Sequence, residues 1–183
     1  MTGRPVAHPL SSLLPNFSKD DGSLPEVEID FCDPALIPKA FALLFARGGV
    51  VASAGGATLW RRDTEEDIAF TGPECADLVI GETADPFHLL LGGICVEGAH
   101  IPDLGVFVHQ GGLILDYRMG PEWGFDQISA LMALLNHFRD MGGTVRVPWW
   151  GVQGEAAFLA ALALDREAGN DEPAIPHSSE RYT

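Results

Sequence analysis

Positive charge is scarce in this sequence. Its 183 residues include only 11 Lys and Arg against 26 Asp and Glu, which gives a formal net charge of −15 at pH 7. Only Lys19 and Lys39 are lysines. Binding of DNA or RNA, and docking on an anionic membrane, both depend on clustered cations. We therefore expect neither a nucleic acid nor a membrane as the partner of this protein.

Long apolar segments are also missing, and cysteine is rare. No apolar run approaches the roughly 20 residues that a membrane-spanning helix needs. Pro5, Pro9 and Pro15 interrupt the first 17 residues, which therefore lack the continuous apolar region of a secretion signal. The three cysteines form no C-x-x-C pair, and their odd number does not favour a disulfide framework. These features predict a cytoplasmic protein with reduced thiols.

Signature motifs of the common enzyme classes do not occur in the chain. There is no G-x-S-x-G, no H-E-x-x-H and no glycine-rich phosphate-binding motif. Glu97, His100 and Asp103 are side chains of the metal-binding kind, but they lie in a segment rich in Gly and Pro. In such a loop their i, i+3 spacing does not place them on a common face. We therefore predict no catalytic residue, no cofactor and no metal.

The patterns that are present predict an α+β fold. Alternation of polar and apolar residues predicts a strand at 26–31, and two apolar runs joined by Gly111-Gly112 predict a hairpin. A second hairpin is expected around Gly55-Gly56, with its strands in 50–62. Further short strands are expected at 67–70, 76–80, 88–97 and 144–150, and three helices are expected in 34–47, 127–141 (capped by Asp126) and 154–169. Separate groups of strands and helices indicate a mainly antiparallel sheet built from hairpins, with about three helices.

The expected domain organisation is simple. Residues 1–25, rich in Pro, Ser and Gly, predict an extended N-terminal arm. Residues 26–169 predict a single α+β domain, and residues 170–183 a flexible polar tail. The sequence does not predict an oligomeric state.

The acidic residues are distributed unevenly. Between Arg62 and Arg118 there is no Lys or Arg, while the same stretch contains eleven carboxylates. It therefore supplies −11 of the net −15. A surface of one sign repels itself, so it either serves solubility or is neutralised by a partner of opposite charge. The eleven residues are Asp63, Glu65, Glu66, Asp67, Glu74, Asp77, Glu82, Asp85, Glu97, Asp103 and Asp116.

Our leading hypothesis is a non-enzymatic binding protein of the inhibitor or immunity type. It would neutralise a toxin-like or nuclease-like basic protein by steric occlusion, with charge complementarity accelerating association. Tryptophan is common at binding hot spots, so an indole is expected to anchor the partner. The expected partner-binding residues are Asp63, Glu65, Glu66, Asp67, Glu74, Asp77, Glu82 and Asp85, with Trp60 and Trp150 as aromatic anchors.

Two alternatives remain open from the sequence. The first is an enzyme of unknown class, and the second is a structural or assembly subunit. For the segment from Asp116 to Glu122 the sequence favours a structural joint over catalysis: Arg118 would pair with one of these two carboxylates while Tyr117 and Trp123 pack. The polar pocket of the expected enzyme would contain His100, His109, Asp116, Tyr117, Arg118 and Glu122.

Overall fold

The fold is built around one six-stranded antiparallel sheet. The computed structural model of the chain describes residues 9–53 and 56–170. The order of the strands across the sheet is β10-β1-β9-β8-β5-β2. The predicted α+β class and the hairpin predicted around Gly111-Gly112 are confirmed. The strands are β1 (Glu26–Phe31), β2 (Val50–Val51), β5 (Phe87–Gly92), β8 (Leu104–His109), β9 (Gly112–Tyr117) and β10 (Gly143–Arg146).

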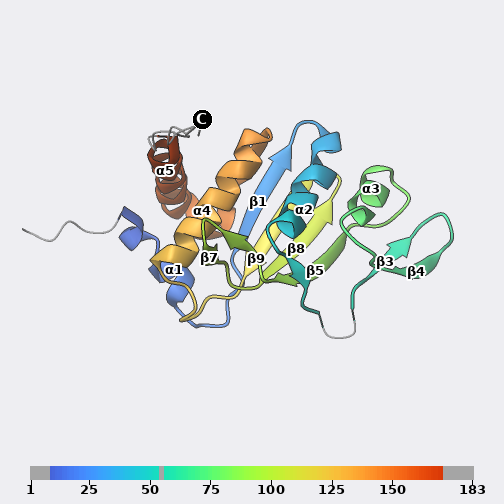
Figure 1. Ribbon diagram of the computed structural model, residues 1–183, viewed down its shortest axis with the longest axis horizontal. Coiled ribbons are helices and arrows are strands. Elements are labelled where there is room, and N and C mark those ends of the chain that lie inside the picture. Colours follow the sequence, from blue (N-terminus) through green and yellow to red (C-terminus); the bar gives the residue numbers. More distant parts are fainter. Residues whose placement is uncertain (1–8, 54–55, 171–183) are drawn as a thin grey trace, which may run out of the picture.

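Within the described residues, helices cover one face of this sheet and leave the other without a helix (Figure 1). In β1, β5, β8 and β9 every second side chain is buried, as expected for a sheet that packs on one side. The opposite side chains of the same strands are mostly half-buried or exposed. The longer helices are α2 (Ile37–Ala46), α4 (Phe125–Asp140) and α5 (Gly151–Asn170), and α5 packs along α4.

The N-terminal segment packs on the core, in contrast to the extended arm that the sequence predicts. Residues 9–18 form a 3-10 turn (Pro9–Ser12) and the short helix α1 (Pro15–Ser18). Leu13 and Phe17 are fully buried, and the ring of Phe17 stacks on Tyr117 with centroids 4.7 Å apart. The prediction was wrong here because two apolar anchors outweigh the local preference of a proline-rich segment. Residues 1–8 and the predicted tail from 171 onward lie outside the described residues.

The predicted helices form, with adjusted starts. Helix α4 is confirmed, but its N-cap is Gly124, whose N–H donates to the Gln127 side-chain oxygen at 3.2 Å, and Asp126 lies in the first turn. Before α2, Asp33 caps the 3-10 turn Pro34–Leu36 by accepting from the Ala35 N–H. Trp149 and Trp150 belong to a 3-10 turn (Pro148–Trp150) rather than to a strand.

The region between β2 and β5 folds differently from the sequence prediction. β3 (Thr58–Arg61) pairs with β4 (Glu66–Ala69), whereas β2 pairs with β5, so the expected hairpin between 50–53 and 57–62 is absent. The segment predicted as a strand at 76–80 lies in helix α3 (Cys75–Ile80). Its Ala76 and Val79 are fully buried, because the helix packs on α2 and β8. We call residues 58–85 the acidic lobe; in Figure 1, β3, β4 and α3 lie at the right-hand end of the molecule.

A small hairpin completes the fold. β6 (Cys95–Val96) pairs with β7 (Ala99–His100), and both strands contact α4. Within the described residues, no helix combines the length and the apolar character that crossing a bilayer requires.

Candidate partner-binding site

The acidic lobe gathers all eight carboxylates that the sequence predicts for partner binding. Seven of them are exposed and Asp85 is half-buried. Two of them, Glu65 and Glu82, occupy turns with φ of 53° and 59°. The only cations in the lobe are Arg61 and Arg62. The predicted charge cluster is therefore formed by one continuous segment at one end of the molecule.

Both arginines of the lobe are already paired with carboxylates. The Arg61 guanidinium donates to both carboxylate oxygens of Asp63, each at 2.8 Å, and these bonds lower the pKa of Asp63. The Arg62 guanidinium pairs with Asp85. Among the described residues, no cation lies within ion-pair distance of the other six carboxylates, Glu65, Glu66, Asp67, Glu74, Asp77 and Glu82.

Trp60 lies between two of the carboxylates. In the β3–β4 register Trp60 stands directly opposite Asp67. On its other side the bridge between Arg61 and Ala84 places Asp85 opposite Trp60, and the Asp85 N–H donates to the Trp60 carbonyl at 2.9 Å. Side chains opposite one another in an antiparallel ladder share a face of the sheet. The indole, which is 42% exposed, therefore has a carboxylate on each flank.

The second predicted anchor, Trp150, lies far from the lobe. Its ring packs edge-on against Phe17 and Phe158, with centroids 5.4 and 4.9 Å apart. These contacts put it beside α1 and α5, at the opposite end of the sheet from the lobe (Figure 1). The structure thus brings Trp60 together with the acidic residues but leaves Trp150 apart from them. At that far end it is Trp149 that is exposed, at 49%.

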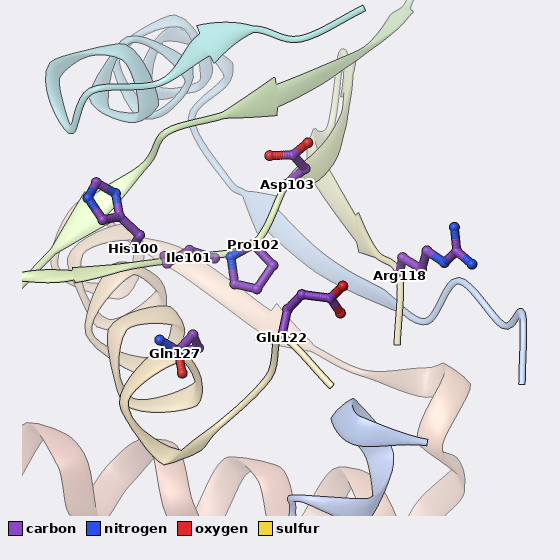
Figure 2. Close-up of a pocket in the computed structure, with 7 residues that line it drawn as sticks. All are labelled: His100, Ile101, Pro102, Asp103, Arg118, Glu122 and Gln127. Carbon is purple, nitrogen blue, oxygen red and sulfur yellow. The ribbon is translucent and has the colours of Figure 1, made fainter. Parts of the chain in front are cut away.

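Part of the alternative polar pocket does form. His100, Arg118 and Glu122 line a pocket of about 480 Å³ together with Ile101, Pro102, Asp103 and Gln127. Figure 2 shows that the His100 imidazole and the Arg118 guanidinium lie on opposite sides of the pocket and point away from each other. The polar groups therefore surround the space without converging on a common point.

The other residues of that alternative lie elsewhere. His109 and Asp116 stand on the uncovered face of the sheet. Tyr117 is buried, its hydroxyl donates to the Asn16 carbonyl at 3.0 Å, and burial raises its pKa. Trp123 is buried beside it, as expected for a joint. The expected pairing of Arg118 with Asp116 or Glu122 was wrong: Arg118 lies 3.9 Å from Asp20.

Sequence reasoning missed the partner of Asp116. The Nε2 atom of His88 lies 2.6 Å from the Asp116 carboxylate. The two residues are 28 positions apart and lie on β5 and β9, two strands that are not neighbours, so no local spacing reveals the pair. Within the described part of the chain, no three His, Cys, Asp or Glu side chains are placed to hold a metal ion.

Comparisons with known proteins identify no relative. No protein-family description matches the chain, and neither the curated proteins nor the solved structures contain a significant match.

Proposed function

We propose that this protein is a non-enzymatic binding protein whose acidic lobe captures a basic protein partner. The mode of action would be that of an inhibitor or immunity protein, which occludes the working surface of a toxin or nuclease. Fast association would come from the charge of the lobe, and a long residence time from its aromatic anchor.

The observation that carries this proposal is the position of Trp60 between Asp67 and Asp85. A Lys or Arg side chain can lie on the face of an indole and gain cation–π attraction. Asp67, the flanking carboxylate that has no cation within ion-pair distance, adds a charge-assisted hydrogen bond to the same cation, while Asp85 on the other flank is held by Arg62. An exposed Trp in this setting is suited to a cationic side chain of a partner.

The charges around Trp60 support the same conclusion. Six carboxylates of the lobe have no cation within ion-pair distance among the described residues, and of these Glu66 stands opposite Arg61 in the β3–β4 ladder, so most of their negative field is not cancelled locally. Such a field attracts a basic protein and accelerates encounter at low ionic strength.

The two alternatives have less support. An enzyme needs groups within hydrogen-bond reach of one reacting centre, and in the 480 Å³ pocket His100 and Arg118 point apart. The hypothesis of an assembly subunit has no observation in its favour in the lobe, because the lobe of a second copy would carry the same negative charge and repel it.

The test separates charge from aromatic contact by means of matched variants. Once a partner has been captured from the native cell, its association and dissociation rates are measured by surface plasmon resonance. Glu65→Lys/Glu82→Lys should slow association about tenfold or more at low salt, because steering depends on charge near the interface. Trp60→Ala should mainly speed dissociation, raising the dissociation constant by about tenfold to a hundredfold, as loss of a hot-spot residue does.

The controls carry the same chemical changes outside the lobe. Glu97→Lys/Glu122→Lys alters the net charge equally, and Glu97, like Glu65, is an exposed turn residue with positive φ (52°). Trp149→Ala removes an equally exposed indole at the other end of the molecule. If the control pair slows association as much as the lobe pair, or if raising the salt leaves the association rate unchanged, the proposed site is wrong.

A further inference from the structure

The uncovered face of the six-stranded sheet has an apolar centre. Open faces of antiparallel sheets normally present polar side chains to water. Here Ile114 of β9 stands opposite Phe107 of β8, and both are half-buried with no helix above them. Leu90 of β5 lies on the next row, opposite Gly105. Three large apolar side chains therefore lie in two neighbouring rows at the middle of a face that no described element covers.

Carboxylates surround this apolar centre. On β1, Glu28 stands opposite Ile114, and Asp30 and Glu26 flank it on the same face. On the other side of the centre, Asp103 reaches over Gly92, where a Cβ would lie 2.7 Å from its oxygen. Asp116 is the fifth carboxylate beside this apolar centre. The cations at the edge are Arg146, 3.8 Å from Glu28, and Arg118.

Asp116 is held across the face by a histidine. A Cβ at Gly105 would lie 2.2 Å from an Asp116 carboxylate oxygen, so the absence of a side chain there lets Asp116 cross β8. It reaches His88 on β5, at 2.6 Å. On the same face the ring of Phe107 stacks on His109, with centroids 5.7 Å apart. The side chains beside the apolar centre are thus fixed by contacts within the face.

We infer that this face is an interaction surface for a cationic protein segment that carries apolar side chains. The inference rests on the proposed function only for the sign of the partner's charge. Ile114, Phe107 and Leu90 would receive the apolar side chains, and the carboxylates around them would receive Lys or Arg. Burial of the apolar centre would make this contact less sensitive to salt than binding at the lobe.

Charge complementarity selects this occupant over a second copy of the chain. In a symmetric dimer each surface patch meets its own copy. The five carboxylates of one face would then oppose the five of the other, with two guanidinium groups per face, among the residues that the structure describes, to offset them. A basic segment removes that repulsion and pairs with the same carboxylates.

The test uses two synthetic peptides of equal length and charge, one alternating Lys with Leu and one alternating Lys with Ser. At about 0.3 M salt, where exposed charges are largely screened, the Lys/Leu peptide should bind about tenfold tighter than the Lys/Ser peptide. In NMR titrations the Lys/Leu peptide should shift the amide signals of β1, β8 and β9.

Variants then locate the binding. Phe107→Thr/Ile114→Thr keeps residues that favour strands and should lower Lys/Leu affinity about tenfold. Val152→Thr, on an 87% exposed apolar residue of α5, should leave that affinity unchanged. Asp30→Asn, a milder change that tests the surrounding carboxylates without altering the apolar centre, should weaken binding at low salt.

The outcomes distinguish this inference from the proposed function. Glu65→Lys/Glu82→Lys should not affect Lys/Leu binding at high salt, whereas it should slow association of the natural partner. Equal affinity for the two peptides, or shifts confined to residues 58–85, would overturn the sheet face as a site and leave the lobe in place. Strong binding of the Lys/Leu peptide to the sheet face, combined with a natural partner whose association rate does not depend on the lobe charge, would support the sheet face as a site and overturn the lobe.

Discussion

At the scale of single residues, two glycines of the sheet leave room for different neighbours, a side chain in one case and a backbone carbonyl in the other. The atoms nearest to a Cβ at Gly105 would belong to the Asp116 carboxylate, with one oxygen at 2.2 Å. A Cβ at Gly112 would lie 2.0 Å from the Ile29 carbonyl oxygen, which belongs to the backbone of the neighbouring strand β1. A side chain can turn away, but a backbone carbonyl in the middle of a sheet cannot move without breaking the ladder.

Gly112→Ala should therefore destabilise the protein much more than Gly105→Ala. We expect the free energy of unfolding to fall by about 3 kcal/mol for Gly112→Ala, typical of overpacking against a fixed neighbour. For Gly105→Ala we expect a fall of about 1 kcal/mol or less, because the main interaction that it disrupts is the exposed His88–Asp116 pair. Urea unfolding followed by circular dichroism measures both. Equal effects would show that the β1–β9 pairing tolerates displacement.

The sequence locates the residues of the candidate site, but not all of the contacts between them. The absence of cations between Arg62 and Arg118 identifies eleven carboxylates, eight of which lie in the acidic lobe, and Trp60 is identified because it adjoins those eight. Its flanking by Asp85 was not predictable, because that contact joins residues 25 positions apart through a bridge at Arg61 and Ala84. Trp150 illustrates the converse: composition suggests an anchor, but long-range packing against Phe17 and Phe158 places it elsewhere.

At the scale of elements, a polar cluster joins α5 to α4. The Asn136 amide donates to the Leu162 carbonyl at 3.1 Å and to the Asp165 carboxylate at 3.2 Å. The Ser129 hydroxyl donates to the other Asp165 oxygen at 3.4 Å. Desolvation dominates over these bonds, so burial raises the pKa of Asp165. The interface between the two helices is therefore sensitive to the charge on one carboxyl group.

This sensitivity predicts a pH dependence of defined sign. When the pKa of an Asp is higher in the folded than in the unfolded state, protonation of that Asp favours the folded state. This stabilisation is fully present below the pKa of the unfolded state, about 3.9, and is lost as the pH rises through the pKa of the folded state. Asp165→Asn removes that pH-dependent penalty. The melting temperature of the variant relative to the parent should therefore increase as the pH is raised above about 4 and then level off.

Glu97→Gln is the control for the removal of one negative charge, because Glu97 is an exposed turn residue of the β6–β7 hairpin. A difference between Asp165→Asn and the parent that stays constant from acid to neutral pH would show that burial of Asp165 does not matter.

Elements with a strong periodic pattern were predictable from the sequence, and short ones were not. Helix α4 and the β8–β9 hairpin follow directly from apolar periodicity and a glycine turn. Helix α3 has six residues, too few to be stable alone, and exists because Ala76 and Val79 are buried against α2 and β8. Likewise, the turn signal at Gly55-Gly56 is local, whereas the pairing of Val51 with Leu91 spans 40 positions.

At the scale of the whole molecule, the negative charge is densest at one end. The lobe carries eight carboxylates and two guanidinium groups that already have partners. Like charges held this close repel one another, and dissolved salt screens the repulsion over about 10 Å at 0.1 M. The free protein therefore tolerates a charge distribution that opposes its own folding.

Added salt should consequently stabilise the free protein. We expect the melting temperature to rise by a few degrees as NaCl is raised from about 0.02 to about 0.3 M, as screening weakens self-repulsion. Glu65→Gln/Glu82→Gln should show a smaller rise than the matched pair Glu97→Gln/Glu122→Gln. Differential scanning fluorimetry measures the trend. A melting temperature that does not change with salt would mean that the lobe carboxylates are too well hydrated to repel each other.

The pairing of β2 with β5 has a consequence for how this protein can change through evolution. Val50 and Val51 stand opposite Gly92 and Leu91, and the Ala52 N–H donates to the Leu90 carbonyl at 2.9 Å. The chain thus leaves the sheet and rejoins it at adjacent points, and everything that carries the lobe lies on the excursion between them. Insertions, deletions and charge changes in the exposed turns of that excursion should therefore leave the register of the six strands intact. Descendants can therefore acquire new binding preferences on an inherited scaffold, provided that α3 keeps its three buried side chains, Cys75, Ala76 and Val79, in place.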